Sequence, residues 1–396
     1  MRDVSIVGVG MTVFKHRPES ISEIGADGII EAFNDDTLKN LEMKDMQAAY
    51  CGTMGGGPQA GQRVLARLKG RMEEKGLEGQ EGLTGIPISN YENMCVSGTN
   101  AFQSGYRDVA AGVHDLVLCF GVEKLGRGSL SMEEKKTVTT DKDFGGGPSP
   151  VPYMFSLNAQ SHMEKYGTTR EQLAAVGVKS KEYASRNPNA QYRQRVTIDD
   201  VLNSKMIADP LTMLMCCPTS TGGAACILAA SDIAKKYNEM PVKVLASVLK
   251  TSKSELGFLE TGWDPNIRAG REAYKMAKIT PKDVDVAQVH DCFAIAELMH
   301  YESFGFCKMG EAGKWIEEGG PCKDGEIPVN TDGGLISKGH PLGATGFAQI
   351  YELTHQLRGD AHTQISPQPK IAWKHNMGGG VGIGMAYAVD VLGEDW

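Results

Sequence analysis

An uninterrupted apolar run follows Asp115 in the segment DLVLCFGV, residues 115–122. A run of this kind, rather than an alternation of polar and apolar residues, is typical of a strand buried on both faces. Segments with strand-like and helical spacing alternate before and after it, as in the helical pattern at 97–111. Such alternation predicts βαβ units and a mainly parallel sheet, so an α/β protein is the expected class.

The same order of segments occurs in both halves of the 396-residue chain, which look like diverged copies. In the first half, the expected strands and helices lie at 4–9, 21–33, 48–52, 62–68, 88–94 and 97–111. In the second half, they lie at 242–251, 266–277, 284–290, 294–304, 343–357, 370–376 and 382–392. We expect an N-terminal half at 1–125 and 210–240, a C-terminal half at 241–396, and an insertion at 126–209 that caps the site.

Composition limits the classes of partner. Hydrophobic residues make up 41% of the chain and charged residues 23%, as in ordinary globular proteins. The net charge of -8 argues against a general affinity for nucleic acid or anionic lipid. No run of about 18 apolar residues is present, so no membrane span is expected. The start, MRDVSIVGVGMTVF, predicts a first strand rather than a signal peptide.

Nine cysteines are scattered along the chain without Cys-x-x-Cys spacing. The adjacent pair Cys216 and Cys217 would form only a strained disulfide. We therefore expect neither a disulfide framework nor a zinc site, and a reducing cytoplasmic compartment fits this pattern. Most cysteines in such a protein are small buried hydrophobic residues.

The segment YENMCVSGTN places Cys95 between a strand candidate and a helix that begins near Ser97. Free amide groups and the positive end of the dipole at a helix N-terminus stabilise a thiolate, which is the reactive form of cysteine. The small residues Ser97, Gly98 and Ala101 would let a substrate approach. Cys95 is therefore a candidate nucleophile, and a buried structural thiol is an equally good interpretation of its position alone.

A second candidate lies in DGGLISKGHPLGATGF, where His340 precedes Pro341 and Gly343 opens the next helix. Proline and glycine at these positions hold the imidazole on a fixed turn. A histidine there could deprotonate a cysteine. Without such a partner, a loop histidine bonded to the backbone is the better interpretation, so the hypothesis depends on contact with Cys95.

A third stretch, QVHDCFAIAEL, places His290 and Cys292 where a buried strand passes into a helix. A histidine N–H can polarise a carbonyl oxygen, and a cysteine can transfer a proton. Asp291 is expected to cap the helix. In KHNMGGGVG, successive glycines from Gly378 expose backbone N–H groups, as an oxyanion hole requires. The triplets in TMGGGP and FGGGP are expected to form turns.

In their order, these motifs resemble the thiolase superfamily, and most closely the sterol-carrier-protein type thiolases. The motifs are a cysteine at a helix start, His-Asp-Cys-Phe, Gly-His-Pro-x-Gly and Asn-x-Gly-Gly-Gly. The stretch at 187–231 and the N-terminal VGVGMTVF add to the likeness, which covers nearly the whole chain. The resemblance implies the thiolase fold, with two similar βαβαβαββ halves, a five-layer α-β-α-β-α core, an inserted loop domain and a homodimer.

The resemblance also implies roles for individual residues. Cys95 stands at the position of the acyl-accepting nucleophile, and His340 at that of the histidine that activates it and binds the thioester oxygen. The family's Asn-Glu-Ala-Phe is replaced by the motif that begins at His290, and its Cys-x-Gly-Gly-Gly by Asn-Met-Gly-Gly-Gly. The usual acid/base cysteine is therefore absent, and in this subgroup its role falls to Cys292. The N–H groups of Cys95 and Gly378 are the implied oxyanion hole.

The expected activity is thiolysis of a 3-oxoacyl-CoA to acetyl-CoA, or another short acyl-CoA, plus a shortened acyl-CoA, or the reverse Claisen condensation. Coenzyme A is the co-substrate, and neither a bound cofactor nor a metal is expected. One alternative is a related retro-aldolase acting on a 3-hydroxyacyl-CoA, although such relatives lack the nucleophilic cysteine. Others are a ketoacyl synthase, which would leave Cys292 idle, and a non-catalytic scaffold. A dinucleotide loop at GVGMT lacks an acidic partner for the ribose.

Partners and the acyl group are left more open by the sequence. The likeness implies a small partner subunit that combines a zinc ribbon with an OB-fold and helps to bind CoA. No sterol-carrier domain is expected after residue 396. The segment 148–157, with Tyr153, Met154 and Phe155, is expected to line the pocket and would suit an acetyl, branched or aromatic acyl group.

Overall fold

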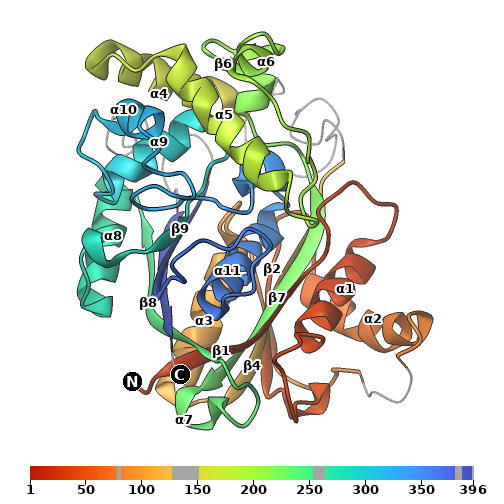
Figure 1. Ribbon diagram of the computed structural model, residues 1–396. Coiled ribbons are helices and arrows are strands. Elements are labelled where there is room, and N and C mark those ends of the chain that lie inside the picture. Colours follow the sequence, from red (N-terminus) through yellow and green to blue (C-terminus); the bar gives the residue numbers. More distant parts are fainter. Residues whose placement is uncertain (78–81, 127–150, 253–263, 380–385, 395–396) are drawn as a thin grey trace.

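The computed structural model describes residues 1–77, 82–126, 151–252, 264–379 and 386–394. Within these ranges, a nine-stranded sheet runs through the molecule (Figure 1). Its strands in spatial order are β3 (Ile88–Tyr91), β2 (Ala48–Gly52), β4 (Leu116–Lys124), β7 (Thr221–Ala230), β1 (Val4–Met11), β8 (Val242–Thr251), β11 (Ala386–Glu394), β10 (Ile371–Gly378) and β9 (Val286–Gln288). β5 (Met206–Ala208) and β6 (Leu211–Thr212) form a small separate pair.

The prediction of a mainly parallel sheet is wrong for its centre. Parallel pairing joins β3 to β2, β2 to β4, and β9 to β10. The inner pairs, β4 with β7, β7 with β1, β1 with β8, β8 with β11 and β11 with β10, are antiparallel. A helical crossover imposes parallel pairing only on the strands that it joins, and several inner neighbours are not joined in that way.

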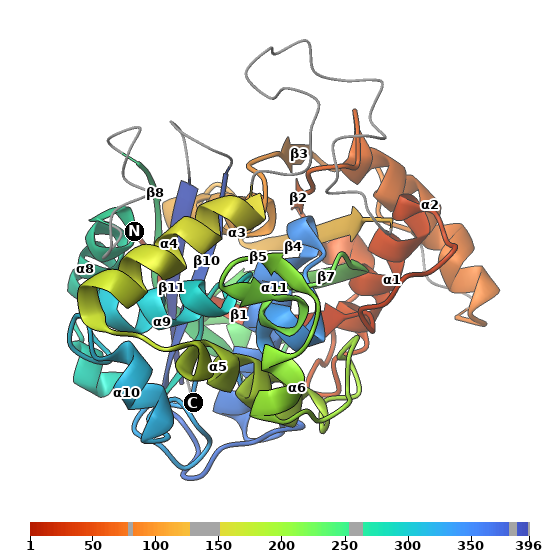
Figure 2. The ribbon, with the colours of Figure 1, turned by 90° about the horizontal axis from the view of Figure 1, so that it is seen from above.

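The helices lie in layers on either side of these strands (Figure 2). The helices of the two halves are α1 (Ile21–Phe33), α2 (Ala60–Glu74), α3 (Ser97–Ala111), α7 (Ser231–Ala234), α8 (Asp264–Ala277), α9 (Ala294–Ser303), α10 (Ala312–Glu317) and α11 (Leu342–Arg358). α3 and α11 pack on each other and on strands of both halves, while α1 covers the far side of the first half and α8 that of the second. Helices and strands therefore alternate as α-β-α-β-α, with α3 and α11 in the middle layer, which are the five layers that the resemblance implies.

Glycines allow the N-terminal ends of α3 and α11 to touch. A Cβ atom added to Gly98 would lie 2.2 Å from the carbonyl oxygen of Gly343. One added to Gly346 would lie 2.3 Å from Oγ1 of Thr99. Any side chain at these positions would therefore force the helix ends apart. Because Cys95 and His340 immediately precede these two helices, this contact determines how closely the two residues approach each other.

The described residues between β4 and β7 form a helical cap. Its described elements include α4 (Val151–Tyr166), α5 (Arg170–Ala184) and α6 (Ile198–Leu202). α4 and α5 pack on α9, and α5 also contacts α10, at the upper end of the molecule in Figure 1. Within the described part of the chain, no helix is both long and apolar enough to cross a membrane.

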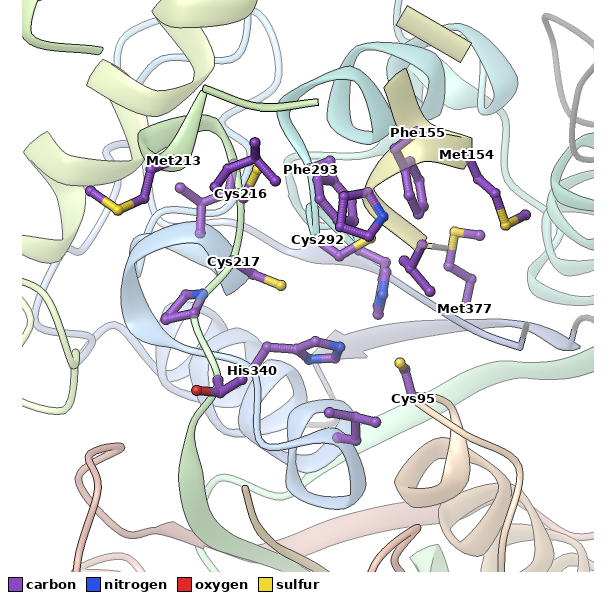
Figure 3. A pocket seen from close by; sticks show the side chains of 18 of the residues that line it. Cys95, Met154, Phe155, Met213, Cys216, Cys217, Cys292, Phe293, His340 and Met377 are labelled. Atoms are coloured by element: carbon purple, nitrogen blue, oxygen red, sulfur yellow. The ribbon is translucent and has the colours of Figure 1, made fainter. Parts of the chain in front are cut away.

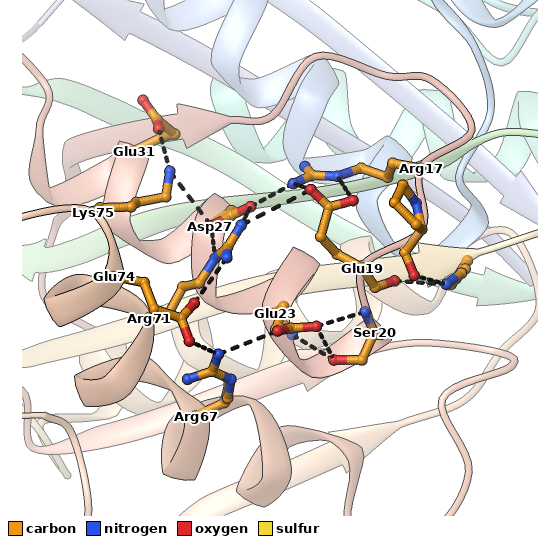
Figure 4. Close-up of polar contacts among 12 residues, drawn as sticks. Arg17, Glu19, Ser20, Glu23, Asp27, Glu31, Arg67, Arg71, Glu74 and Lys75 are labelled. Atoms are coloured by element: carbon orange, nitrogen blue, oxygen red, sulfur yellow. Dashed lines mark hydrogen bonds and ion pairs between the residues drawn. The ribbon is translucent and has the colours of Figure 1, made fainter.

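An ion-pair network joins α1 to α2 on the outer face of the first half (Figure 4). Asp27 is almost fully buried and accepts hydrogen bonds from Arg17 at 2.6 Å and from Arg71 at 2.8 Å. Lys75 lies 3.4 Å from the same carboxylate. Several cations thus compensate one buried charge, which fixes α2 against α1.

A second ion pair lies inside the sheet and supports the first stability prediction. Lys374 on β10 and Asp390 on β11 are 2.6 Å apart, and both side chains are fully buried. Replacing Lys374 with methionine leaves an uncompensated buried carboxylate, so we expect a loss of about 3–5 kcal/mol in the free energy of unfolding. Urea denaturation measures this loss. The double variant Lys374→Met/Asp390→Leu should recover most of it, and a single variant as stable as the wild type would contradict the prediction.

Candidate active site

A cavity of about 570 Å³ lies between the helical cap and the N-terminal ends of α3 and α11. The residues proposed from the sequence for catalysis and for the oxyanion hole all line it: Cys95, His290, Cys292, His340 and Gly378. Figure 3 shows several of their side chains pointing into the same space from different elements. Apolar side chains form most of the remaining wall, among them Met154, Phe155, Met213, Phe293 and Met377.

A tight turn after β3 positions Cys95. Met94 adopts a left-handed backbone conformation with φ of 51°, which is uncommon for a residue with a side chain. The hydroxyl of Ser97 stabilises the turn, since it accepts from the Asn93 N–H at 2.8 Å and donates to the Met94 carbonyl at 2.6 Å. Cys95 therefore enters the cavity just before α3, whose N-cap is Val96.

The expectation that the helix start stabilises a thiolate at Cys95 is wrong. Burial, together with the nearby carboxylate of Glu123, raises the pKa of the Cys95 thiol to about 12. Glu123 is fully buried and accepts from the backbone N–H groups of Met54 and Gly55, each at 2.9 Å. A helix start lowers the pKa of a nearby thiol, but desolvation and the negative charge of Glu123 raise the pKa of Cys95 by more. Cys95 thus rests as a thiol and needs a base.

The raised pKa of Cys95 has a measurable consequence. Below its pKa the thiol form dominates, and the thiolate fraction rises about tenfold per pH unit. We expect the rate of alkylation of Cys95 by iodoacetamide to climb steadily between about pH 6 and 9, without a plateau. Peptide mass spectrometry of samples quenched over time gives this rate. A plateau in that range would indicate a preformed thiolate–imidazolium pair instead.

His340 is held as a neutral base. Its backbone N–H donates to Ser220 Oγ at 2.9 Å, and its Nδ1 lies 2.8 Å from Thr345 Oγ1. The Thr345 hydroxyl already donates to the Pro341 carbonyl at 3.0 Å, so it accepts from Nδ1–H. Nε2 of His340 therefore carries the free lone pair, and it is buried with no partner among the described residues. Burial lowers the pKa of His340 to about 3, which keeps the ring neutral.

A buried chain of hydrogen bonds gives His290 the opposite tautomer. Lys374 Nζ donates to Thr99 Oγ1 at 2.7 Å, and this hydroxyl donates to Asn376 Oδ1 at 3.3 Å. The Asn376 amide then turns its NH₂ group toward His290 Nδ1, 2.8 Å away. Because Nδ1 accepts this bond, the ring proton of His290 is on Nε2. His290 is thus a hydrogen-bond donor to the site, whereas His340 is an acceptor.

Cys95 and the two histidines meet. One ligand atom from each of Cys95, His290 and His340 lies within 4.8 Å of the other two. The two imidazole rings have centroids 5.0 Å apart and are nearly perpendicular. His340 therefore lies beside Cys95, the contact on which its proposed role as a base depended. The same three atoms are the group best placed to hold a metal ion in the described residues, although they supply only three donors.

Cys292 enters the cavity beside a strand-like segment that the sequence did not assign to the site. The Cys217 N–H donates to the Cys292 carbonyl at 2.9 Å, and Cys216 forms a bridge with Phe293. All three cysteines are free thiols that line the cavity (Figure 3). Burial first, and then the neighbouring Cys217, raises the pKa of Cys292 well above its ordinary value. Cys292 is therefore a protonated sulfur at rest.

Gly378 is where β10 touches the backbone of Cys95. A Cβ atom added to Gly378 would lie 2.6 Å from the Val96 nitrogen and 2.9 Å from the Cys95 nitrogen. Only glycine allows this approach, which sets two backbone segments beside one wall of the cavity. The third glycine of the motif, Gly380, and the FGGGP segment lie outside the described residues.

Two smaller expectations need correction. Asp291 does not cap the helix that follows it, because its carboxylate accepts from the N–H groups of Leu335 at 2.7 Å and Ile336 at 3.3 Å, across the site. Tyr153 does not line the cavity, since it is 53% exposed on α4, whereas its neighbours Met154 and Phe155 do. Residues 148–150 of the same expected segment lie outside the described residues.

Family models cover most of the chain. The thiolase N-terminal domain matches residues 4–232, and the thiolase C-terminal domain-like model matches residues 260–394. The chain belongs to the thiolase superfamily. Its relatives support the sterol-carrier-protein type subgroup that the motifs indicated.

Two curated relatives and one solved structure illustrate the relationship. An acetyl-CoA acetyltransferase from Methanothermobacter thermautotrophicus is 39% identical over 96% of this chain and 97% of its own length. Sterol carrier protein 2 from Bos taurus is 37% identical over 95% of this chain and 70% of its own. The solved Ltp2-ChsH2(DUF35) aldolase superposes with a TM-score of 0.79 at 22% identity, over 99% of this chain and 98% of its own. This last likeness concerns the fold alone.

Proposed function

We propose that this member of the thiolase superfamily cleaves a 3-oxoacyl-CoA with CoA, through an acyl group held on Cys95, or runs the reverse Claisen condensation. The observation that carries the proposal is the meeting of Cys95 with His290 and His340 in a cavity that Cys292 also lines. A nucleophile, a base, an oxyanion donor and a second proton carrier are the groups that this reaction requires.

Acylation starts with the neutral Cys95–His340 pair. The free Nε2 of His340 takes the thiol proton as the sulfur attacks the keto carbon of the substrate. The resulting oxyanion forms near the amide groups of Cys95 and Gly378, which we assign as its hydrogen-bond donors. Because Cys95 is a thiol at rest, thiolate appears only when a substrate is present to consume it.

Cleavage of the carbon–carbon bond then leaves an acyl group on Cys95 and releases the enolate of the shorter acyl-CoA. The Nε2–H of His290 and the newly protonated Nε2 of His340 donate to the enolate oxygen. Cys292 supplies the proton to the enolate carbon, which its protonated resting state allows. The Cys292 thiolate next deprotonates incoming CoA, whose thiolate attacks the acyl-Cys95 thioester. Cys95 leaves as the thiolate and takes back its proton from His340, which restores the resting enzyme.

The alternatives are less well supported. A retro-aldolase requires a base but no acyl-cysteine, so it would leave the pairing of Cys95 with His340 without a purpose. The aldolase with a similar fold is too distant in sequence to carry its activity to this chain. A scaffold would not need His290 and His340 in different tautomers around one sulfur.

We also propose a homodimer and a small partner subunit of the zinc-ribbon and OB-fold type. β3 lies at one edge of the sheet, where a strand from a second copy can pair with it. The solved aldolase pairs Ltp2 with ChsH2, a DUF35 protein, which supports the idea of a partner for this chain. No permanently bound cofactor is required.

Steady-state thiolysis of a panel of 3-oxoacyl-CoAs tests the proposed reaction, with and without a co-encoded small subunit. We expect CoA-dependent loss of the 3-oxoacyl-CoA and formation of two acyl-CoA products. The matching 3-hydroxyacyl-CoAs serve as controls for aldolase activity. Cleavage of the hydroxy series to an aldehyde or ketone, with the oxo series untouched, would favour the aldolase instead.

A further inference from the structure

Four lysine side chains are buried in the described part of the chain, and one of them differs from the others. Lys181 is 5% exposed and lies on α5. The other three each pair with a buried carboxylate: Lys179 with Glu297, Lys338 with Asp332, and Lys374 with Asp390. No carboxylate among the described residues pairs with Lys181, whose recorded contact is the ring of Tyr192, 4.9 Å from Nζ.

The side chain of Lys181 is thus largely buried, and its ammonium has no counter-ion among the described residues. Burial alone lowers the pKa of Lys181 to about 8, and no neighbouring charge offsets the effect. At neutral pH the ammonium is still mostly protonated. An unpaired buried charge is unfavourable for folding, so an anion that binds beside it would restore the missing interaction. Lys179, two residues earlier on the same helix, is by contrast paired with Glu297.

Lys181 faces the catalytic cavity. It lines the same cavity as Cys95 and His340, together with its ring partner Tyr192. The cavity wall is largely apolar and contains no carboxylate among the described residues. A single ammonium in such a wall attracts a ligand anion strongly, because little water competes for it. The cation therefore lies where a substrate of Cys95 binds.

We propose that Lys181 binds a carboxylate carried by the acyl chain, so that the substrates are 3-oxoacyl-CoAs with a second acidic group. This inference rests on the proposed thiolase function and names its substrate class. The phosphates of CoA are the other anions of the substrate, but they lie a full pantetheine arm away from the thioester. Lys181 lines the cavity of Cys95 itself, which favours the acyl part as its partner.

Paired substrates test this inference. The probes are 3-oxoadipyl-CoA, which ends in a carboxylate, and 3-oxohexanoyl-CoA, which has the same number of acyl carbons and ends in a methyl group. Longer homologues of both extend the comparison. The variants are Lys181→Met, which removes the charge, and Lys181→Arg, which keeps it, with the exposed Lys69→Met on α2 as a matched control.

We expect the wild type to prefer the carboxylate series in kcat/KM. Lys181→Met should lower kcat/KM for that series by roughly 30-fold or more, mainly through KM, since removal of one partner of a buried charge pair has effects of this size. The methyl-ended series should change little, and Lys181→Arg should keep much of the preference. The ratio of the two series within one variant does not depend on how much of the protein is folded.

Two outcomes overturn the inference. An equal loss on both series would assign Lys181 to a phosphate of CoA or to a structural role. If the ratio of kcat/KM for the two series is the same in the wild type and in Lys181→Met, Lys181 has no role in recognition of the acyl group. Absence of thiolysis in the wild type with every probe would instead contradict the proposed function itself, so the two failures are distinguishable.

Discussion

Cys95→Ser is expected to lose thiolysis, with kcat reduced by at least about 10⁴-fold, as when the nucleophile of a covalent enzyme is removed. A serine hydroxyl is far less acidic and a poorer nucleophile than a thiol, so a site built around a cysteine activates it far less effectively. The fall in absorbance of the 3-oxoacyl-CoA upon addition of CoA measures the rate. The loss should be the same at every substrate concentration, because binding does not require the sulfur.

Cys322→Ser is the matched control for this substitution. Cys322 is a free cysteine that does not line the catalytic cavity. The same change of sulfur to oxygen there should leave kcat within about twofold of the wild type, as is usual for substitutions away from a site. Near-normal turnover by Cys95→Ser would contradict the role of Cys95 as nucleophile.

Cys292→Ala should separate the two halves of the reaction. We expect turnover to fall by about 10²–10⁴-fold, the range for loss of a general acid or base. Exchange of deuterium from solvent into the methyl group of acetyl-CoA should fall with it, because this exchange requires the proton carrier. Transfer of an acetyl group from acetyl-CoA to Cys95 needs no proton on carbon, and CoA can leave as its thiolate without a proton from Cys292, so this transfer should survive. Intact-protein mass spectrometry and the exchange rate report the two steps separately.

Cys217→Ala is the informative comparison, since Cys217 lines the same cavity and its backbone bonds to Cys292. This variant should keep deuterium exchange near the wild-type rate. Exchange that survives in Cys292→Ala but is lost in Cys217→Ala would transfer the proton-carrying role to the neighbouring sulfur. The two variants therefore decide which of two adjacent thiols transfers the proton.

Local pattern was sufficient to predict most elements. The helices expected at 21–33 and 97–111 coincide with α1 and α3, and the apolar run at 115–122 lies in β4. Each of these signals is contained within one segment, as periodicity and apolar runs are. The direction of the inner strands was not predictable in the same way, because it depends on which strands become neighbours across the sheet.

In the candidate site too, local sequence predicts some features, while others depend on residues that are distant in the chain. Cys95, His290, Cys292 and His340 were identifiable from motifs, and the structure brings them to one cavity. The pKa of Cys95 was predicted in the wrong direction, because burial and Glu123 act through space and not through the adjacent sequence.

Other contributors gave no local signal. Cys217 reaches the cavity by pairing with a distant segment. Lys181 differs from the other buried lysines only because no carboxylate among the described residues pairs with it, and the sequence does not show this. The tautomers of the histidines depend on Thr345 and Asn376, whose partners lie on other elements or a turn away. Asn376 at least occupies a position where the family's motif has cysteine, which marked it for attention.

The most direct measurement is the mass of the Cys95 peptide after the protein is mixed with an isotopically labelled 3-oxoacyl-CoA in the absence of CoA and quenched in acid. The proposed reaction predicts that the labelled, shortened acyl group is attached at Cys95, and that added CoA removes it. An unmodified Cys95 under conditions in which product forms, or a label on Cys292 or Cys217 instead, would contradict it.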